Sequence, residues 1–184
     1  MGNPSTTSPI ASAPKQFYIG RTFAARHYDI KTSDGECAFY VDIPLRGPAL
    51  RLGPDKESPS IAESHKPFLS RNIIIGVEDP ENPKARRWEE MRRESAANYR
   101  WAMTLGGEDG EKLTFLWVQM LRENYKLLDM QNGDLLATFT CDITPRTCRA
   151  CGILQVNKSY GRTFDLMVLT TFMTMFSRWK VHIL

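Results

Sequence analysis

The chain has 184 residues, of which 42% are hydrophobic, and a formal net charge of +3 from 24 basic and 21 acidic side chains. This length and apolar content predict one globular domain with a buried core. The small net charge gives no argument for a nucleic-acid-binding protein. No early apolar run resembles a secretory signal, and none reaches the roughly 20 residues of a membrane span, so we expect a cytoplasmic protein with reduced cysteines.

The first residues, 1–15, are rich in Ser, Thr and Pro and predict a disordered tail ahead of a single domain at residues 16–184. The tail begins with Met1 and Gly2 and has Thr6 in the sixth position, which fits the N-myristoylation pattern. The pattern is short, so a chance match in a tail of this composition is the alternative. Gly2 is therefore a hypothetical lipidation site.

Two turn signals, Asp34-Gly35 and Asn132-Gly133, are each flanked by β-rich runs and predict hairpins. Other runs predict strands near residues 17–19, 49–52, 60–62, 68–77, 98–105, 112–120, 152–156 and 181–184. The Pro-rich residues 44–67 are otherwise expected to be irregular. The highly charged residues 78–95 are expected to form a short surface helix or a long loop.

A C-terminal stretch, residues 164–179, is uncharged from Leu166 to Ser177 and apolar over most of a helical circumference. It predicts a buried helix with Thr163 as N-cap, too short for an ordinary membrane span. Its predicted core residues are Leu166, Leu169, Phe172, Met173 and Phe176. Many strands and one apolar helix predict a mainly β protein, a closed antiparallel β-barrel of about 10–12 strands wrapped around that helix, because closure removes exposed strand edges.

This order of segments resembles the tubby C-terminal-like superfamily, which contains tubby proteins, phospholipid scramblases and LURP-one-related proteins. The similar segments are the hairpin from Tyr28 to Ile43, the hairpin from Tyr125 to Thr140, and the stretch from Phe164 to Trp179. The resemblance implies an antiparallel barrel threaded by a hydrophobic C-terminal helix. Residues 44–67 and 78–95 depart from the pattern and look like lineage-specific loops, as in fungal members of the group. None of tubby's phosphoinositide-contacting residues has a residue-by-residue match.

No catalytic constellation is present: the chain has no GxSxG, HExxH or Walker sequence. Cys148 and Cys151 form a CxxC pair, but the second pair typical of a structural zinc site is missing. Reduced structural cysteines are the favoured interpretation, with a metal or redox role as the alternative. We therefore expect a protein that is not an enzyme and has neither cofactor nor metal.

Basic side chains are the remaining binding candidates. The candidate lipid- or anion-binding residues are Arg86, Arg87, Trp88, Arg92, Arg93, Arg146, Arg149, Lys158 and Arg162. A loop of arginines with an exposed tryptophan suits an anionic bilayer, where each base contributes about 1 kcal/mol. The alternative is an ordinary solvated surface of paired charges.

Three functions compete. The first is a monomeric, non-enzymatic binding module that contacts phosphoinositides or an anionic membrane surface through basic loops, as a peripheral membrane protein. The second is a protein-interaction scaffold that displays residues 44–67 and 78–95. The third, an enzyme or a carrier of a small apolar ligand, ranks last because a barrel filled by a helix leaves little room, and a sizeable cavity would revive it.

Overall fold

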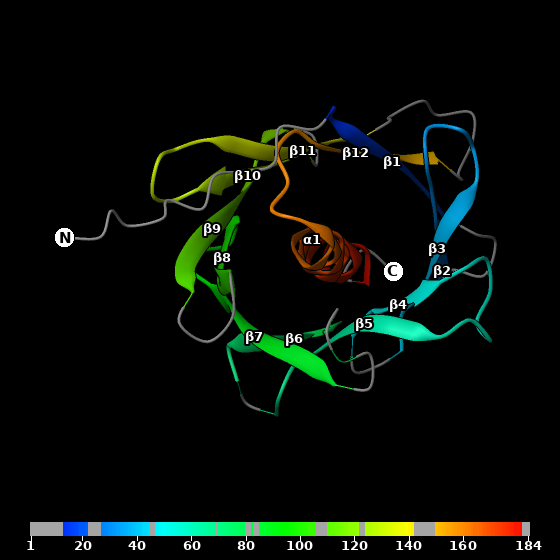
Figure 1. Ribbon diagram of the computed structural model, residues 1–184, viewed down its shortest axis with the longest axis horizontal. Helices are drawn as coiled ribbons and strands as arrows, with labels where there is room; N and C mark the ends of the chain where they lie inside the picture. The colour runs from blue at the N-terminus through cyan, green and yellow to red at the C-terminus, as the bar shows by residue number, and fades with distance from the viewer. Residues whose placement is uncertain are drawn as a thin grey trace.

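The computed structural model describes residues 13–21, 27–44, 47–68, 70–79, 82, 85–105, 110–121, 124–141 and 150–181. Within these residues, twelve strands form a closed antiparallel barrel, and the helix α1, Arg162–Val181, lies inside it (Figure 1). Each strand pairs with its neighbour in sequence, and β1 pairs with β12 to close the ring. The strands are β1 Lys15–Arg21, β2 His27–Lys31, β3 Cys37–Asp42, β4 Ala49–Leu52, β5 Ser60–His65, β6 Asn72–Glu78, β7 Arg86–Arg93, β8 Asn98–Leu105, β9 Glu111–Gln119, β10 Tyr125–Asp129, β11 Leu135–Cys141 and β12 Ala150–Val156.

The strands alternate between the helix side and the solvent side. In β9, for example, Leu113, Phe115 and Trp117 are at most 2% exposed, whereas the residues between them are only partly buried or exposed. Successive side chains of a strand point to opposite faces, so one face of each strand supplies the barrel interior. The hairpins predicted at Asp34-Gly35 and Asn132-Gly133 connect β2 to β3 and β10 to β11.

The helix fills the barrel as the sequence predicted. All five predicted core residues of α1 are 3% exposed or less. The ring of Phe172 lies 4.5 Å from that of Phe139 and 5.8 Å from those of Trp117 and Tyr125, measured between centroids. The prediction of a closed antiparallel barrel of 10–12 strands around a C-terminal helix is confirmed.

Threonine hydroxyls allow the polar arc of α1 to be buried as well. The side chain of Thr170 donates to the carbonyl of Leu166 at 2.7 Å, so its hydrogen-bonding capacity is used within the helix. Thr171 bonds back in the same way and also accepts a 2.9 Å hydrogen bond from Trp117 Nε1. Buried polar groups with partners cost little, so the helix is compatible with the interior on all sides.

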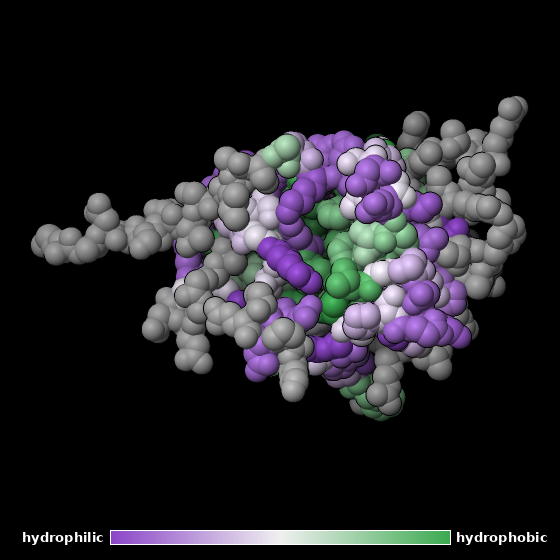
Figure 2. Space-filling model, turned by 45° about the vertical axis from the view of Figure 1, so that its right-hand side comes forward, coloured by the Kyte–Doolittle hydropathy of each residue, from purple (hydrophilic) through white to green (hydrophobic). Residues whose placement is uncertain are grey.

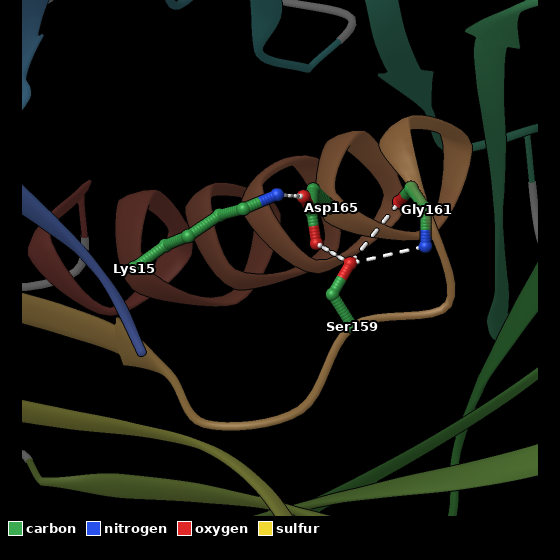
Figure 3. Close-up of polar contacts among 4 residues, drawn as sticks. All are labelled: Lys15, Ser159, Gly161 and Asp165. Carbon is green, nitrogen blue, oxygen red and sulfur yellow. Dashed lines mark hydrogen bonds and ion pairs between the residues drawn. The ribbon is translucent and has the colours of Figure 1, made fainter. Parts of the chain in front are cut away.

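The start of α1 is fixed by a polar cluster. Ser159 Oγ donates to Asp165 Oδ1 at 2.7 Å and accepts from the Gly161 backbone N–H at 3.0 Å, while Lys15 Nζ lies 2.5 Å from Asp165 Oδ2 (Figure 3). The chain enters the helix through Gly161, which has a φ of 107° that favours glycine. The helix therefore begins at Arg162, and the prediction of Thr163 as N-cap is wrong.

The prediction for the highly charged region is wrong. Residues 78–95 contain β7, which pairs with β6 through seven residue pairs from Asn72↔Arg92 to Glu78↔Arg86. A charged sequence forms this strand because most of its side chains reach solvent while Met91 is buried in the core. Within residues 44–67, by contrast, the strands predicted at 49–52 and near 60–62 are confirmed as β4 and β5, and β5 extends further, to His65.

The boundaries of the predicted elements also shift. The strand predicted from residue 68 begins at Asn72, and Val181 belongs to α1 rather than to a last strand, while residues 182–184 lie outside the described residues. Residues 1–12 also lie outside them, so the division into a tail and one domain stays a prediction, with Lys15 as the first residue of β1.

Strand register divides the connections between two ends of the barrel. At the helix-entry end, β1 begins opposite the end of β12 (Lys15↔Val156) and α1 starts. At the far end lie the β5–β6, β7–β8 and β9–β10 connections, because β6 begins opposite the end of β7 (Asn72↔Arg92) and β8 begins near the end of β9 (Asn98↔Val118).

Candidate functional site

The arginines predicted to form one loop lie at two ends of one strand. Arg86 pairs with Glu78 at the helix-entry end of β7, whereas Arg92 and Arg93 lie at the far end. Arg86 and Arg92 are six residue steps apart along an extended strand, which is a distance of about 20 Å. The prediction that residues 86–93 form a single basic loop is therefore wrong.

Two of these arginines stabilise the barrel wall. Arg86 Nη1 lies 2.9 Å from Glu63 Oε1, and Arg86 Nη2 donates to the Ser60 carbonyl at 3.2 Å, which ties β7 to β5. Arg87 donates to the Thr104 carbonyl of β8, and its Nε lies 3.4 Å from Glu89 Oε1. Cations held by such partners have less capacity for an external anion.

Arg87 and Glu89 fill a seam in the wall. The paired residues of β7 and β8 run only from Met91↔Trp101 to Arg93↔Tyr99, so the first half of β7 has no ladder to β8. Burial raises the pKa of the Glu89 carboxyl above its usual range, although Arg87 opposes this shift. Arg87, paired with Glu89, therefore links β7 to β8 where strand pairing is absent. Burial makes the ionised form of the Glu89 carboxyl less favourable.

Trp88 packs against its own barrel rather than standing at a loop tip. A Cβ added to Gly76, its partner in β6, would lie 2.5 Å from the Trp88 ring, so the indole covers this glycine. The His65 ring lies 5.6 Å away in an edge-on arrangement. Packing over a strand glycine explains why a partly exposed tryptophan occurs here.

The remaining predicted site residues do not join a common cluster. Lys158 Nζ lies 2.6 Å from Asp134 Oδ2, and Arg162 Nη2 lies 3.6 Å from Glu78 Oε2, both at the helix-entry end. The other three predicted positions, Gly2, Arg146 and Arg149, lie outside the described residues.

Other residues lie at the far end of the barrel, on the β5–β6 connection, at the end of β7 and on the β9–β10 connection. We call this group the basic arc: Lys66, Phe68, Arg71, Arg92, Arg93, Met120 and Leu121. Phe68 is 94% exposed and Leu121 is 87% exposed, and they lie on the β5–β6 and β9–β10 connections. The arginines at the end of β7 lie between these two connections in strand order. Two apolar tips therefore flank a group of cations.

Among the described residues, three of the four cations of the basic arc form no ion pair, and the fourth, Arg93, is held by a backbone carbonyl. Glu94 is engaged by Arg100, with contacts of 2.8 and 3.1 Å. Arg93 donates to the Ser95 carbonyl at 3.0 Å. Within the described part of the chain, Lys66, Arg71 and Arg92 form no ion pair.

Sequence reasoning identified Arg92 and Arg93 but missed Lys66, Phe68, Arg71 and Leu121. The residues of the basic arc are separated by up to 55 positions, counted from Lys66 to Leu121. The number of strands between two connections predicts whether they lie at the same end, because the connections of an up-and-down barrel alternate between its two ends. Because residues 86–93 were expected to be a helix or loop, β7 was missing from this number, and connections on either side of it would be placed at the wrong ends.

A groove opens at the helix-entry end between α1 and the wall. Its volume is about 300 Å³, and its apolar lining consists of Phe17, Phe39, Leu52, Leu166 and Leu169. Lys15, Arg162 and Asp165 also line it. Figure 2 shows a hollow in this face of the molecule, with hydrophobic residues at the bottom and hydrophilic residues around it. The expectation that the helix leaves little room concerned an internal cavity, and this open groove at the end of the barrel does not contradict it.

Metal and redox chemistry gain no site from the described residues. Among them, no three His, Cys, Asp or Glu side chains gather as a metal site would require. Cys151 is buried at 4% exposure, but Cys148 lies outside the described residues, so the role of the CxxC pair stays a prediction. Within the same part of the chain, no helix is both long and apolar enough to cross a lipid bilayer.

Comparison with known proteins identifies a fold relative. A scan against protein-family models found no match, and a search of curated proteins found none either. Among solved structures, the chain is similar to the X-ray structure of an Arabidopsis thaliana protein, with a TM-score of 0.56 and 11% sequence identity. The similarity covers 87% of this chain and 90% of the plant protein. At this identity the likeness concerns the fold alone: the chain shares its barrel architecture with the plant protein.

Proposed function

We propose that the protein is a non-enzymatic module that binds anionic membrane surfaces, including phosphoinositide-containing ones, through the basic arc. The observation that carries this proposal is the exposure of Phe68 and Leu121 at the end of the barrel where Arg92 and its neighbouring cations lie. Isolated exposed hydrophobic residues are common, but two nearly fully exposed tips at the same end as cations that form no ion pair within the described residues suit a bilayer interface.

The magnitudes favour reversible binding. Each base close to an anionic bilayer contributes about 1 kcal/mol, so the four cations of the basic arc contribute about 4 kcal/mol at low salt. The apolar tips add to this by entering the interface, and the sum suits a peripheral protein that exchanges with solvent. Because the electrostatic part decays within about 10 Å at 0.1 M salt, binding is expected to weaken as salt is raised.

The barrel fold supports a wider assignment, which we also propose: membership of the tubby C-terminal-like superfamily, near the LURP-one-related proteins. Support comes from the twelve-strand barrel around a hydrophobic helix and from its similarity to the Arabidopsis thaliana structure. Tubby proteins and scramblases both act at membranes, which agrees with a lipid-binding function. The basic arc, rather than family membership, carries the functional proposal.

Vesicle co-sedimentation tests the proposal. The unacylated protein is mixed with vesicles of neutral lipid, or of neutral lipid with a phosphoinositide, at about 0.1 and 0.5 M salt. We expect salt-sensitive binding to the anionic vesicles alone. Arg92→Gln with Arg93→Gln should weaken it about 30-fold at low salt, the equivalent of about 2 kcal/mol.

A matched variant controls for total charge. Lys56→Gln with Lys112→Gln removes two exposed cations from the helix-entry end and should leave binding nearly unchanged. Equal losses in the two double variants would show that net charge, and no particular surface, attracts the protein. Absence of binding at both salt concentrations would reject the membrane function and favour the protein-interaction scaffold.

The protein-interaction scaffold has fewer loop residues to display than the sequence indicated. Of its two predicted display loops, residues 44–67 contribute β4 and β5, and residues 78–95 contribute β7. The β4–β5 connection, residues 53–59, is the longest fully described connection within them. Acylation of Gly2 would add a second membrane contact, which is why the unacylated protein is used first.

A further inference from the structure

The groove at the helix-entry end forms where the wall is incomplete. The first residues of β1, from Lys15 to Phe17, pair with β12, but β1 pairs with β2 only from Tyr18 onward. The β2 strand ends at Lys31, opposite Cys37 at the start of β3, so Lys15–Phe17 of β1 extend beyond the β2–β3 hairpin and have no strand partner on that side. Leu166 and Leu169 of α1 close the bottom of this space at 3% and 1% exposure.

The charged side chains at the groove differ in how closely they are held by partners within the protein. Asp165 is already matched, because Lys15 lies 2.5 Å and Ser159 Oγ lies 2.7 Å from its two oxygens. Arg162 has a 64% exposed side chain, and its 3.6 Å contact with Glu78 is longer than a hydrogen bond. A solvent-exposed pair of this kind contributes little, so Arg162 can turn to a second anion at small cost.

We propose that this groove binds a free single-chain carboxylate, with its alkyl chain against Leu166 and Leu169 and its carboxylate at Arg162. The volume of about 300 Å³ lies at the small end of ligand sites. It equals about ten waters of 30 Å³ each, and a methylene group is of similar size, so a chain of about ten carbons fits. The apolar lining of the groove can hold an alkyl chain, and the adjacent Arg162 can bind the carboxylate at its end.

The position of the groove identifies the source of the ligand. It opens at the helix-entry end, whereas the basic arc lies at the far end. A protein bound to a bilayer through the basic arc would present the groove to solvent. The ligand therefore arrives as a free carboxylate rather than as the chain of a membrane phospholipid. This choice of source rests on the proposed membrane function, whereas binding in the groove rests on the groove itself and is tested separately.

A ligand titration followed by methyl NMR tests the inference in the full-length chain. Sodium decanoate, decanol and decyltrimethylammonium are titrated below their aggregation concentrations, and the methyl signals of Leu52, Leu166 and Leu169 are followed. We expect decanoate to shift these signals with a Kd of about 1 mM or below, which is ordinary efficiency for a ligand of this size. Decyltrimethylammonium should bind at least about threefold more weakly, since its head group is repelled by Arg162.

Leu52 gives a matched pair of charge variants. It lines the mouth of the groove and is 45% exposed, so a charged side chain there does not enter the core. Leu52→Asp should weaken decanoate binding about threefold and Leu52→Lys should strengthen it by a similar factor, while decanol binding responds equally to both. Arg162→Gln should remove the preference for decanoate over decanol, and Lys56→Gln, on the same end, should leave it intact.

Three results would overturn the inference. If none of the three compounds shifts the methyl signals, the groove holds no ligand of this class. If all three shift them equally, or if Leu52→Asp and Leu52→Lys have the same effect on decanoate, the cation plays no part in recognition. Arg92→Gln with Arg93→Gln should leave decanoate binding unchanged, which separates failure here from failure of the membrane proposal.

Discussion

Removing the two apolar tips of the basic arc tests whether the barrel enters the bilayer interface. Phe68 is 94% exposed and Leu121 is 87% exposed, so Phe68→Ala with Leu121→Ala removes almost no contact within the folded protein. Full burial of such side chains contributes about 1.5–3 kcal/mol each, and an interfacial position gives about half of that. The pair is therefore expected to contribute about 2 kcal/mol, or about 30-fold in vesicle affinity.

The assay is a vesicle-binding isotherm at about 0.1 and 0.5 M salt. Salt screens the contribution of the cations but leaves the apolar one, so the loss on removing the tips should stay near 30-fold at both salt concentrations. The loss from Arg92→Gln with Arg93→Gln should instead shrink as salt is raised. This difference separates insertion from charge attraction.

Met130 and Leu135 supply the control for the apolar tips. They are 43% and 42% exposed and lie at the helix-entry end, so Met130→Ala with Leu135→Ala should leave vesicle binding unchanged. If the variant without Phe68 and Leu121 binds as tightly as the wild type at both salt concentrations, the tips do not enter the membrane and the reasoning from their exposure is refuted.

Three further predictions concern stability, measured by urea unfolding. Phe172→Ala should lower the free energy of unfolding by about 3–5 kcal/mol, because the lost ring is fully buried, and Phe172→Asp should prevent folding by burying an unpaired charge. Gly152→Ala should cost about 2 kcal/mol or more, since φ is 149° and the new Cβ would lie 2.2 Å from the Thr140 carbonyl oxygen. Glu89→Gln should stabilise the protein at pH 7 but not below the carboxyl's unfolded pKa of about 4.5, while Arg87 keeps its bond to β8.

The sign for Glu89 follows from its raised pKa. Between the unfolded and folded values the native state binds more protons than the unfolded state, so stability falls as pH rises through this window. The amide of glutamine cannot ionise and removes this loss. A Gln variant less stable than the wild type at pH 7 would contradict the pKa argument. Soluble, cooperatively unfolding Phe172→Asp protein would contradict the central-helix arrangement, and an unchanged Gly152→Ala protein would contradict the close approach of β12 to β11.

The sequence determined the architecture because the strongest patterns in it are local. The uncharged run from Leu166 to Ser177 permits no exposed face, and its threonines satisfy their hydroxyls within the helix, so it had to be enclosed. The Asp34-Gly35 and Asn132-Gly133 turns fixed two hairpins by backbone chemistry alone. A helix without a polar face must be buried, and many strands need their edges paired. A closed barrel around the helix meets both requirements.

Only the tertiary structure decided which charges and apolar residues lie together. Arg86 and Arg92 are six positions apart in sequence, yet an extended strand carries them to opposite ends of the barrel, whereas Phe68 and Leu121 lie at the same end although four strands separate them. The sequence of β7 carries no clear alternation, because Arg87 and Glu89 face the seam to β8, so its strand character depended on its neighbours. The groove likewise arises from where β2 stops relative to β1, a matter of register between strands that no local pattern contains.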